Sequence, residues 1–157
     1  MDRKLEIIQC ARELIEERGL AKTSVAALAE RMNVARPLFY HYFPSKEDLV
    51  AAVLDTYVDE FIASLKEWNA QRVEGDIEGA LDTIVALIRD QLFDNDNAHK
   101  PFRRALATHE NASLYLRFIN RVADASATYI VETTVADFGR LHKVRIDHVY
   151  ETFYMLI

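Results

Sequence analysis

The sequence has 157 residues, of which half are hydrophobic, and a formal net charge of −6. This composition excludes a disordered chain, and no apolar run approaches the about 20 residues that a membrane-spanning helix requires. Residues 1–6 lack the apolar core of a secretion signal, and the single cysteine excludes an intramolecular disulfide framework, so we expect a cytoplasmic protein.

Only 4 glycines and 3 prolines interrupt the chain, which favours long helices. An apolar stripe at helical spacing predicts a first helix that ends at Gly19. Ser24 is a candidate N-cap for a short second helix, and Asn33 tolerates the left-handed geometry of a tight turn. Arg36 and Pro37 open a third short helix, and Pro44 closes it.

The segment 45–48 resembles a helix-capping box with Asp in place of Glu, and it opens a long helix as far as Trp68. Apolar spacing predicts further helices over residues 77–92, 101–109, 112–138 and 146–157, with a loop at 94–97 and a break at Gly139. The last segment ends on apolar residues without a polar tail. We therefore expect the natural protein to continue beyond Ile157.

Two short helices separated by three residues define a helix-turn-helix, whose second helix lies in the DNA major groove. Phe39 and Phe43 lie four residues apart and are expected to point into the domain core. Arg36 suits a guanine edge, Leu38 a thymine methyl group, and hydroxyl or ammonium groups suit phosphate oxygens. The residues expected to contact DNA are Ser24, Arg36, Pro37, Leu38, Tyr40, His41 and Lys46.

The charge pattern allows a local phosphate-binding surface in an acidic protein. The segment from Arg18 to Lys46 contains five basic residues and a single acidic residue, Glu30. Phosphate binding requires a positive surface only where the DNA lies. By itself, the same pattern also fits an ordinary solvated face.

Residues 23–49 resemble the DNA-binding signature of the tetracycline-repressor (TetR) family. The residues that fill the signature positions are Ser24, Leu28, Ala29, Phe39, Tyr40, Phe43, Lys46 and Leu49. Two positions depart from the family pattern. Asn33 replaces the usual glycine, and Ala35 replaces a frequent serine, so a capping hydrogen bond to the recognition helix is expected to be missing.

The resemblance implies a homodimer that binds a pseudo-palindromic operator and responds to a small, mostly apolar effector. Aromatic and polar side chains of the later helices are candidates for the effector cavity. Each aromatic taken alone fits core packing better than a cavity role, and the polar side chains fit an ordinary solvated face equally well. The candidate effector residues are Tyr57, Phe61, Phe102, Arg103, His109, Tyr115 and Phe118. The candidate dimer residues are Ile146, Val149, Tyr150 and Phe153, with a second dimer helix expected beyond Ile157.

The predicted fold is all-α, with a three-helix helix-turn-helix DNA-binding domain over residues 1–46 and a helical effector-binding and dimerisation domain over 47–157. No catalytic group, metal site or cofactor motif is identified, so we do not expect an enzyme. The function predicted is a ligand-responsive repressor. The alternatives are a TetR-like DNA-binding protein controlled by a protein partner, and a helical small-molecule-binding protein that does not bind DNA.

Overall fold

The computed structural model describes residues 2–92, 106, 108–141 and 147–157. Within these residues every regular element is helical, as the all-α prediction requires. No described helix is long and apolar enough to cross a membrane. The chain forms two compact units, one of residues 1–57 and 98–115 and the other of residues 58–97 and 116–157. The predicted functional boundary between residues 46 and 47 stays a prediction.

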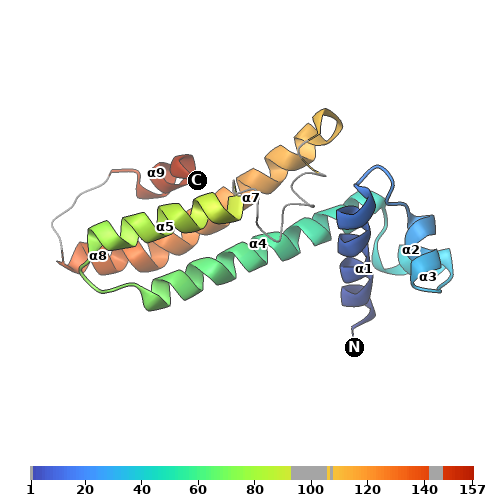
Figure 1. Ribbon diagram of the computed structural model, residues 1–157, viewed down its shortest axis with the longest axis horizontal. Helices are drawn as coiled ribbons and strands as arrows, with labels where there is room; N and C mark the ends of the chain where they lie inside the picture. The colour runs from blue at the N-terminus through green and yellow to red at the C-terminus, as the bar shows by residue number, and fades with distance from the viewer. Residues whose placement is uncertain (1, 93–105, 107, 142–146) are drawn as a thin grey trace. The chain divides into compact units, whose positions relative to one another are not determined.

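In the first unit, helix α1 (Arg3–Arg18) runs across the N-terminal end of α4, and α2 and α3 lie beside it (Figure 1). Asp2 caps α1 by accepting a hydrogen bond from the Lys4 amide at 2.9 Å. Gly19 ends the helix with a φ of 82°, a left-handed value that glycine adopts without steric cost. The buried stripe of α1 is Ile7, Ile8, Ala11, Leu14 and Ile15.

The helix-turn-helix forms as predicted. Helix α2 (Val25–Arg31) is capped by Ser24, whose Oγ accepts from the Ala27 amide at 3.2 Å, and α3 spans Arg36–Tyr42. Asn33 in the turn has a φ of 52°, which is the left-handed geometry predicted for it. Ala35 provides no side-chain cap to α3, and Pro37 occupies the first turn, where its missing N–H is tolerated.

Three residues separate helix α4 (Lys46–Gln71) from α3. The first part of α4, up to Tyr57, belongs to the first unit, and the remainder belongs to the second. Ser45 accepts a hydrogen bond from the Asp48 amide at 3.1 Å, which is the first half of the predicted capping box. The second half differs, because the Asp48 carboxylate accepts from the Ser45 hydroxyl at 2.7 Å. The shorter aspartate side chain thus closes the box on the hydroxyl.

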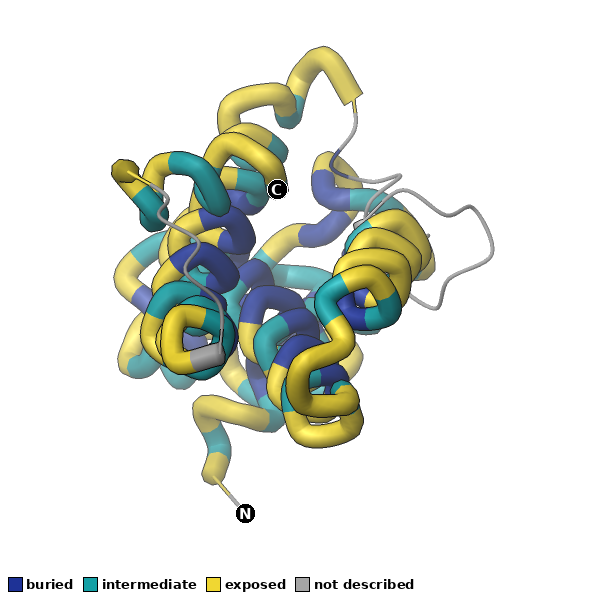
Figure 2. Tube along the Cα trace, turned by 90° about the vertical axis from the view of Figure 1, so that its left-hand side faces the viewer, coloured by how far each residue is buried: buried dark blue, intermediate teal, exposed yellow. Residues whose placement is uncertain are grey.

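The second unit contains the C-terminal half of α4, helix α5 (Ile77–Leu92), a π-helical turn (Val131–Val135) and helix α8 (Ala136–Leu141). It also contains helix α7 (Ala112–Ile130) from Leu116 onward. The α4 segment, α5 and the α7–α8 segment lie alongside one another (Figure 1), and their buried residues face the neighbouring helices (Figure 2). Helix α9 (Val149–Leu156) follows a left-handed residue, His148, with a φ of 55°.

Two details of the predicted helices are corrected. Gly139 does not end the helix, because it lies inside α8, where an added Cβ would face open space. Leu81, which the helical spacing of the apolar residues in 77–92 predicts to be buried, is 54% exposed. Over residues 77–90, the buried α5 residues are Ala80 and Ile84. The predicted loop at 94–97 and residues 101–105 and 107 of the predicted helix at 101–109 lie outside the described residues. The last residue of that predicted helix, His109, begins a 3₁₀ turn that ends at Asn111.

Candidate nucleic-acid interface

The two faces of α3 have opposite characters. Phe39 and Phe43 are each only 3% exposed, and their rings contact each other at a centroid distance of 5.8 Å. On the other side, Arg36, Pro37, His41 and Tyr40 are exposed, and Leu38 is half-buried. Tyr40 is 54% exposed and stands edge-on to the Phe39 ring at 5.3 Å, which holds its ring in place. The helix therefore presents the predicted side chains to solvent on a rigid aromatic base.

The turn that precedes α3 is open to solvent. A shallow depression of about 720 Å³ is lined by residues of α2, the turn and the start of α3. These residues are Ala26, Ala29, Glu30, Asn33, Val34, Ala35 and Arg36. No described segment of the chain covers the depression, so the first residue of the recognition helix is accessible to a large partner.

The two predicted phosphate contacts at helix ends differ in availability. Ser24 is exposed, but its Oγ already accepts from the Ala27 amide. Its hydroxyl proton is still available to a phosphate oxygen. The Lys46 ammonium is half-buried and donates to the Leu20 carbonyl at 2.9 Å. Because an ammonium has three donors, this bond orients Lys46 and leaves two donors for other acceptors.

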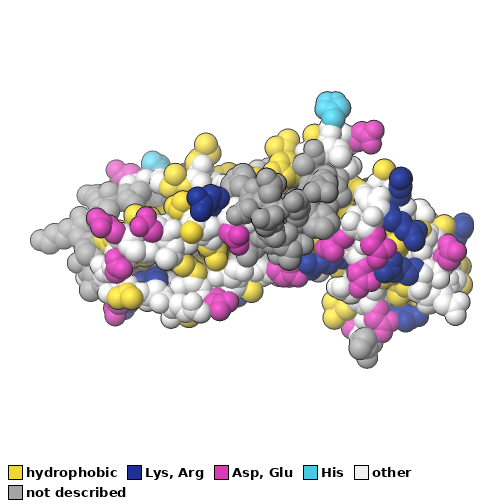
Figure 3. All heavy atoms as spheres, viewed as in Figure 1, with side chains coloured by type: hydrophobic (Ala, Val, Ile, Leu, Met, Phe, Trp, Pro, Cys, Tyr) yellow, Lys and Arg dark blue, Asp and Glu magenta, His cyan; other side chains and the backbone are white. Residues whose placement is uncertain are grey.

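The basic segment is less positive in the fold than in the sequence. Arg31 binds the Glu17 carboxylate through both terminal nitrogens, at 2.7 and 2.8 Å, and also contacts Glu13 at 3.3 Å. Figure 3 accordingly shows acidic side chains among the basic ones over the helices of the first unit. Within the described part of the chain, Arg18, Lys22 and Arg36 have no ion-pair partner.

The structure describes five of the seven effector candidates, and their environments differ. Tyr57 is 4% exposed and belongs to the first unit, where its hydroxyl donates to Glu16 of α1. Phe61 and Phe118 are buried in the second unit at 3% and 5% exposure. Tyr115 is half-buried and His109 is exposed. Phe102 and Arg103 lie outside the described residues.

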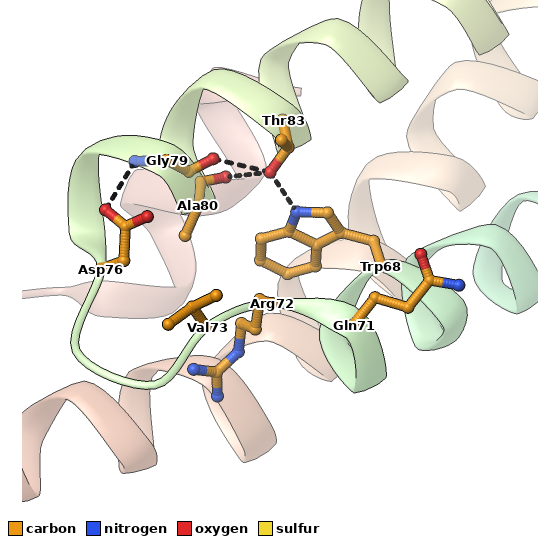
Figure 4. A pocket seen from close by; sticks show the side chains of 8 residues that line it. All are labelled: Trp68, Gln71, Arg72, Val73, Asp76, Gly79, Ala80 and Thr83. Carbon is orange, nitrogen blue, oxygen red and sulfur yellow. Dashed lines mark hydrogen bonds between the residues drawn. The ribbon is translucent and has the colours of Figure 1, made fainter.

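A pocket of about 280 Å³ lies where α4 ends and α5 begins (Figure 4). One wall is the indole ring of Trp68, whose N–H donates to the Thr83 hydroxyl at 2.9 Å. Val73 and Ala80 provide apolar surface, and Asp76 stands at the α5 end, where its carboxylate accepts from the Gly79 amide at 3.0 Å. The remaining lining residues are Gln71, Arg72 and Gly79. Sequence reasoning placed Trp68 at the end of the long helix but did not predict this pocket.

The dimer candidates of α9 lie partly open to solvent. Val149, Tyr150 and Phe153 are half-buried, and Ile146 lies outside the described residues. Tyr150 donates a 2.5 Å hydrogen bond to Asp124 of α7, and this bond raises the pKa of Tyr150 to about 12. Two apolar residues beyond them are highly exposed, Met155 at 81% and Leu156 at 72%.

Sequence reasoning missed two polar clusters. In the first unit, Arg12 and Glu16 of α1 meet Tyr57 of α4. In the second, Asn69 is a hub, because its Oδ1 accepts from Arg72 at 2.7 Å and from Thr134 at 3.2 Å. The i,i+4 spacing of Arg12 and Glu16 indicates the part of the first cluster that lies within α1. The second depends on contacts 60 or more residues apart in sequence, for which a single sequence gives no signal.

Comparison with known proteins matches residues 7–53 to the bacterial regulatory proteins of the tetR family. The regulator EthR of Mycobacterium tuberculosis is 35% identical over 104 residues, which cover 66% of this chain and 46% of EthR. The repressor KstR2 of Rhodococcus jostii is 27% identical over 130 residues, or 83% of this chain and 57% of KstR2. The chain thus spans about half the length of the curated relatives it matches.

A solved structure of a transcriptional regulator from Aquifex aeolicus VF5 has a similar fold. Its TM-score is 0.55 at 20% sequence identity, and the alignment covers 82% of this chain and 71% of the other. At that identity the likeness concerns the fold alone. The matched signature region coincides with α1, the helix-turn-helix and the start of α4, which are the elements that present Arg36 and Tyr40. Over residues 7–53 the chain therefore has the N-terminal region of the tetR family of bacterial regulatory proteins.

Proposed function

We propose that this chain is a DNA-binding transcriptional repressor that inserts α3 into the major groove of a pseudo-palindromic operator as a homodimer. The observation that carries the proposal is the division of α3 into a buried Phe39–Phe43 face and an exposed face with Arg36 and Tyr40. Arg36 stands in the first turn of α3, where recognition-helix residues reach base edges. A helical carrier that does not bind DNA would not require these side chains to be exposed on one helix face.

Selection from a random pool of duplex DNA tests this function. The chain should enrich an inverted repeat whose half-site centres lie about 10 base pairs, or a multiple of that, apart. Binding should weaken steeply with salt because phosphate contacts release counterions. If the pool yields no repeat and the retained DNA is random in sequence, specific operator recognition is excluded.

The homodimer is supported by the apolar end of α9, where Met155 and Leu156 are exposed. A two-fold dimer would place two recognition helices on one face of the DNA and would bury such residues against their symmetry mates. Sedimentation equilibrium of the natural protein, with the dimer helix expected beyond Ile157, measures the association directly. The double change Met155→Ser and Leu156→Ser should weaken dimer formation, and sedimentation of that protein as a monomer at all concentrations would contradict the dimer.

The control of DNA binding by a small apolar effector is supported by the pocket beside Trp68. Its indole wall and the facing Val73 and Ala80 suit a small flat molecule. Trp68 is the only tryptophan, so its fluorescence reports occupancy directly. We expect toluene or ethylbenzene, whose own emission lies outside the tryptophan range, to shift the emission of the protein, and Ala80→Leu, which fills the pocket, to abolish the shift.

Effector control also requires coupling to DNA. By linkage, a compound that releases the operator must bind more weakly, by the same factor, when the operator is present. A titration with and without the selected duplex measures that factor. Equal affinities would show that the compound is not an effector, and the absence of coupling for every bound compound would favour control by a protein partner.

A further inference from the structure

Tyr57 is committed to a contact with α1. Its side chain is almost fully buried, and its hydroxyl donates a hydrogen bond to Glu16 Oε1. The guanidinium of Arg12 lies over the Tyr57 ring, 4.1 Å from its centroid, and Arg12 Nε donates to the same Glu16 oxygen at 3.2 Å. The phenol, the carboxylate and the guanidinium therefore form a cluster that joins α4 to α1.

The C-terminal half of α1 is the common attachment point of the DNA-binding unit. Glu17 holds Arg31 of α2, and the Leu20 carbonyl just beyond α1 holds Lys46 at the first residue of α4. Glu16 holds Tyr57 further along α4. Helices α2 and α3 lie in the chain between α1 and α4. The angle between α1 and α4 therefore sets the orientation in which α3 is presented.

Two attachment points on α4 fix its direction relative to α1, whereas a single attachment point would let α4 pivot. Lys46 and Tyr57 are separated by eleven residues, or about 16 Å along α4. The side chains buried on α4 between them, such as Leu49, Val53 and Leu54, supply cohesion. Apolar contact is not directional, however, whereas a hydrogen bond depends on distance and angle. The Tyr57 bond therefore restricts the swing of α4 about its Lys46 end.

The chemistry of the cluster suits a permanent link. Burial, together with the bond to Glu16, raises the pKa of Tyr57 well above its ordinary value. The phenol thus keeps its proton and remains a donor over the working pH range. Removal of Glu16 would leave the buried Tyr57 hydroxyl without this acceptor, which costs more than the bond contributes on balance.

We propose that Tyr57, held by Arg12 and Glu16, is a positioning residue for DNA binding. It touches no DNA itself. It fixes α4 against α1 so that α3 is presented in the orientation that the operator requires. The inference rests on the proposed function.

The test compares Tyr57→Phe with the wild-type chain on a duplex selected by the wild-type chain. This change keeps the ring and the Arg12 contact and removes only the hydroxyl. We expect operator affinity to fall by about three- to tenfold, the range of one net hydrogen bond. The base preference and the salt slope should not change, since no base or phosphate contact is lost. Glu16→Ala should match Tyr57→Phe, whereas Glu16→Gln, which keeps an acceptor oxygen, should retain most of the affinity.

Ile7→Val serves as the control for stability, because it trims a buried α1 residue without breaking a polar link. Measured where every variant is fully folded, its operator affinity should stay within about twofold of wild type. The proposal is overturned if Tyr57→Phe binds like wild type, or if Ile7→Val loses as much affinity as Tyr57→Phe. A wild-type chain that selects no DNA would instead refute the proposed function.

Discussion

Arg31 lies fork-to-fork against Glu17, with its two terminal nitrogens 2.7 and 2.8 Å from the two carboxylate oxygens. This pair joins α2 to α1 within the helix-turn-helix. The positive charge of Arg31 is therefore already paired with a carboxylate of the same chain. Lys22 has no ion-pair partner among the described residues, so its ammonium is more available to a phosphate than the guanidinium of Arg31 is.

The first prediction separates these two kinds of cation by their salt dependence. Lys22→Gln should lower the slope of log affinity against log salt by about one per subunit. Arg31→Gln should leave the slope almost unchanged, because Arg31 contacts Glu17 and not phosphate. Binding titrations of both variants at four salt concentrations provide the measurement. An equal loss of slope for Arg31→Gln would show that the pair opens on DNA.

The second prediction concerns acid stability. The hydrogen bond from Arg31 lowers the pKa of Glu17 below its ordinary value in the folded chain. A carboxylate with a depressed folded pKa contributes stability above its unfolded pKa of about 4.3, and that contribution is lost as pH falls through the folded pKa. In urea denaturation, Arg31→Gln should therefore be less stable than wild type at pH 7 and closer to it at pH 3. A stability difference that does not vary with pH would contradict this.

The third prediction concerns base recognition by Arg36, which is exposed in the first turn of α3. Arg36→Ala should cost about 1–3 kcal/mol of operator binding and relax the preference at one base position in each half-site. Repeating the duplex selection with the variant shows the altered position. Tyr40→Phe is the comparison, because loss of a phosphate contact should weaken all sequences alike. Retention of the full base preference by Arg36→Ala would mean that α3 is docked differently.

The local structure of the DNA-binding unit followed from the sequence, because its signals are short-range. The Ser24 cap, the left-handed Asn33 and the bounds of α3 all depend on residues within a few positions. The buried pair Phe39 and Phe43 follows from helical spacing alone.

What the sequence could not supply is the pairing of polar groups that are distant in the chain. Nothing near Tyr57 distinguishes a residue that lines a cavity from one that bonds Glu16, 41 positions earlier. The neutralisation of Arg31 likewise depends on how α2 packs against α1. The π-helical turn at Val131–Val135 has no proline or glycine signal, and it was predicted as plain helix.

The fourth prediction concerns the polar hub of the second unit. Asn69 accepts hydrogen bonds from Arg72 and Thr134 and donates to the Tyr129 hydroxyl at 3.2 Å. The Arg72 side chain is only 6% exposed, so Asn69→Ala leaves a buried donor without its acceptor. We expect a loss of about 1–3 kcal/mol in the free energy of unfolding. Urea denaturation followed by Trp68 fluorescence measures it.

Gln71 is exposed, so Gln71→Ala is the control for the hub and should change the free energy of unfolding by less than about 0.5 kcal/mol. Equal stability of Asn69→Ala and Gln71→Ala would show that the hub does not hold the second unit together.

The last prediction uses two helical glycines at which an added methyl group would meet different surroundings. At Gly139 a Cβ has no neighbour within 4 Å, so Gly139→Ala should stabilise the chain by up to about 1 kcal/mol through helix propensity. At Gly79 the same atom would lie 2.2 Å from Asp76 Oδ2, so the carboxylate must rotate away. That carboxylate caps α5 by accepting from the Gly79 amide, and loss of a cap costs about 1 kcal/mol. The propensity gain and the capping loss should nearly cancel, which leaves Gly79→Ala close to wild type. Thermal denaturation of the two variants side by side checks this, and equal stabilisation by both would show that the Asp76 cap contributes nothing.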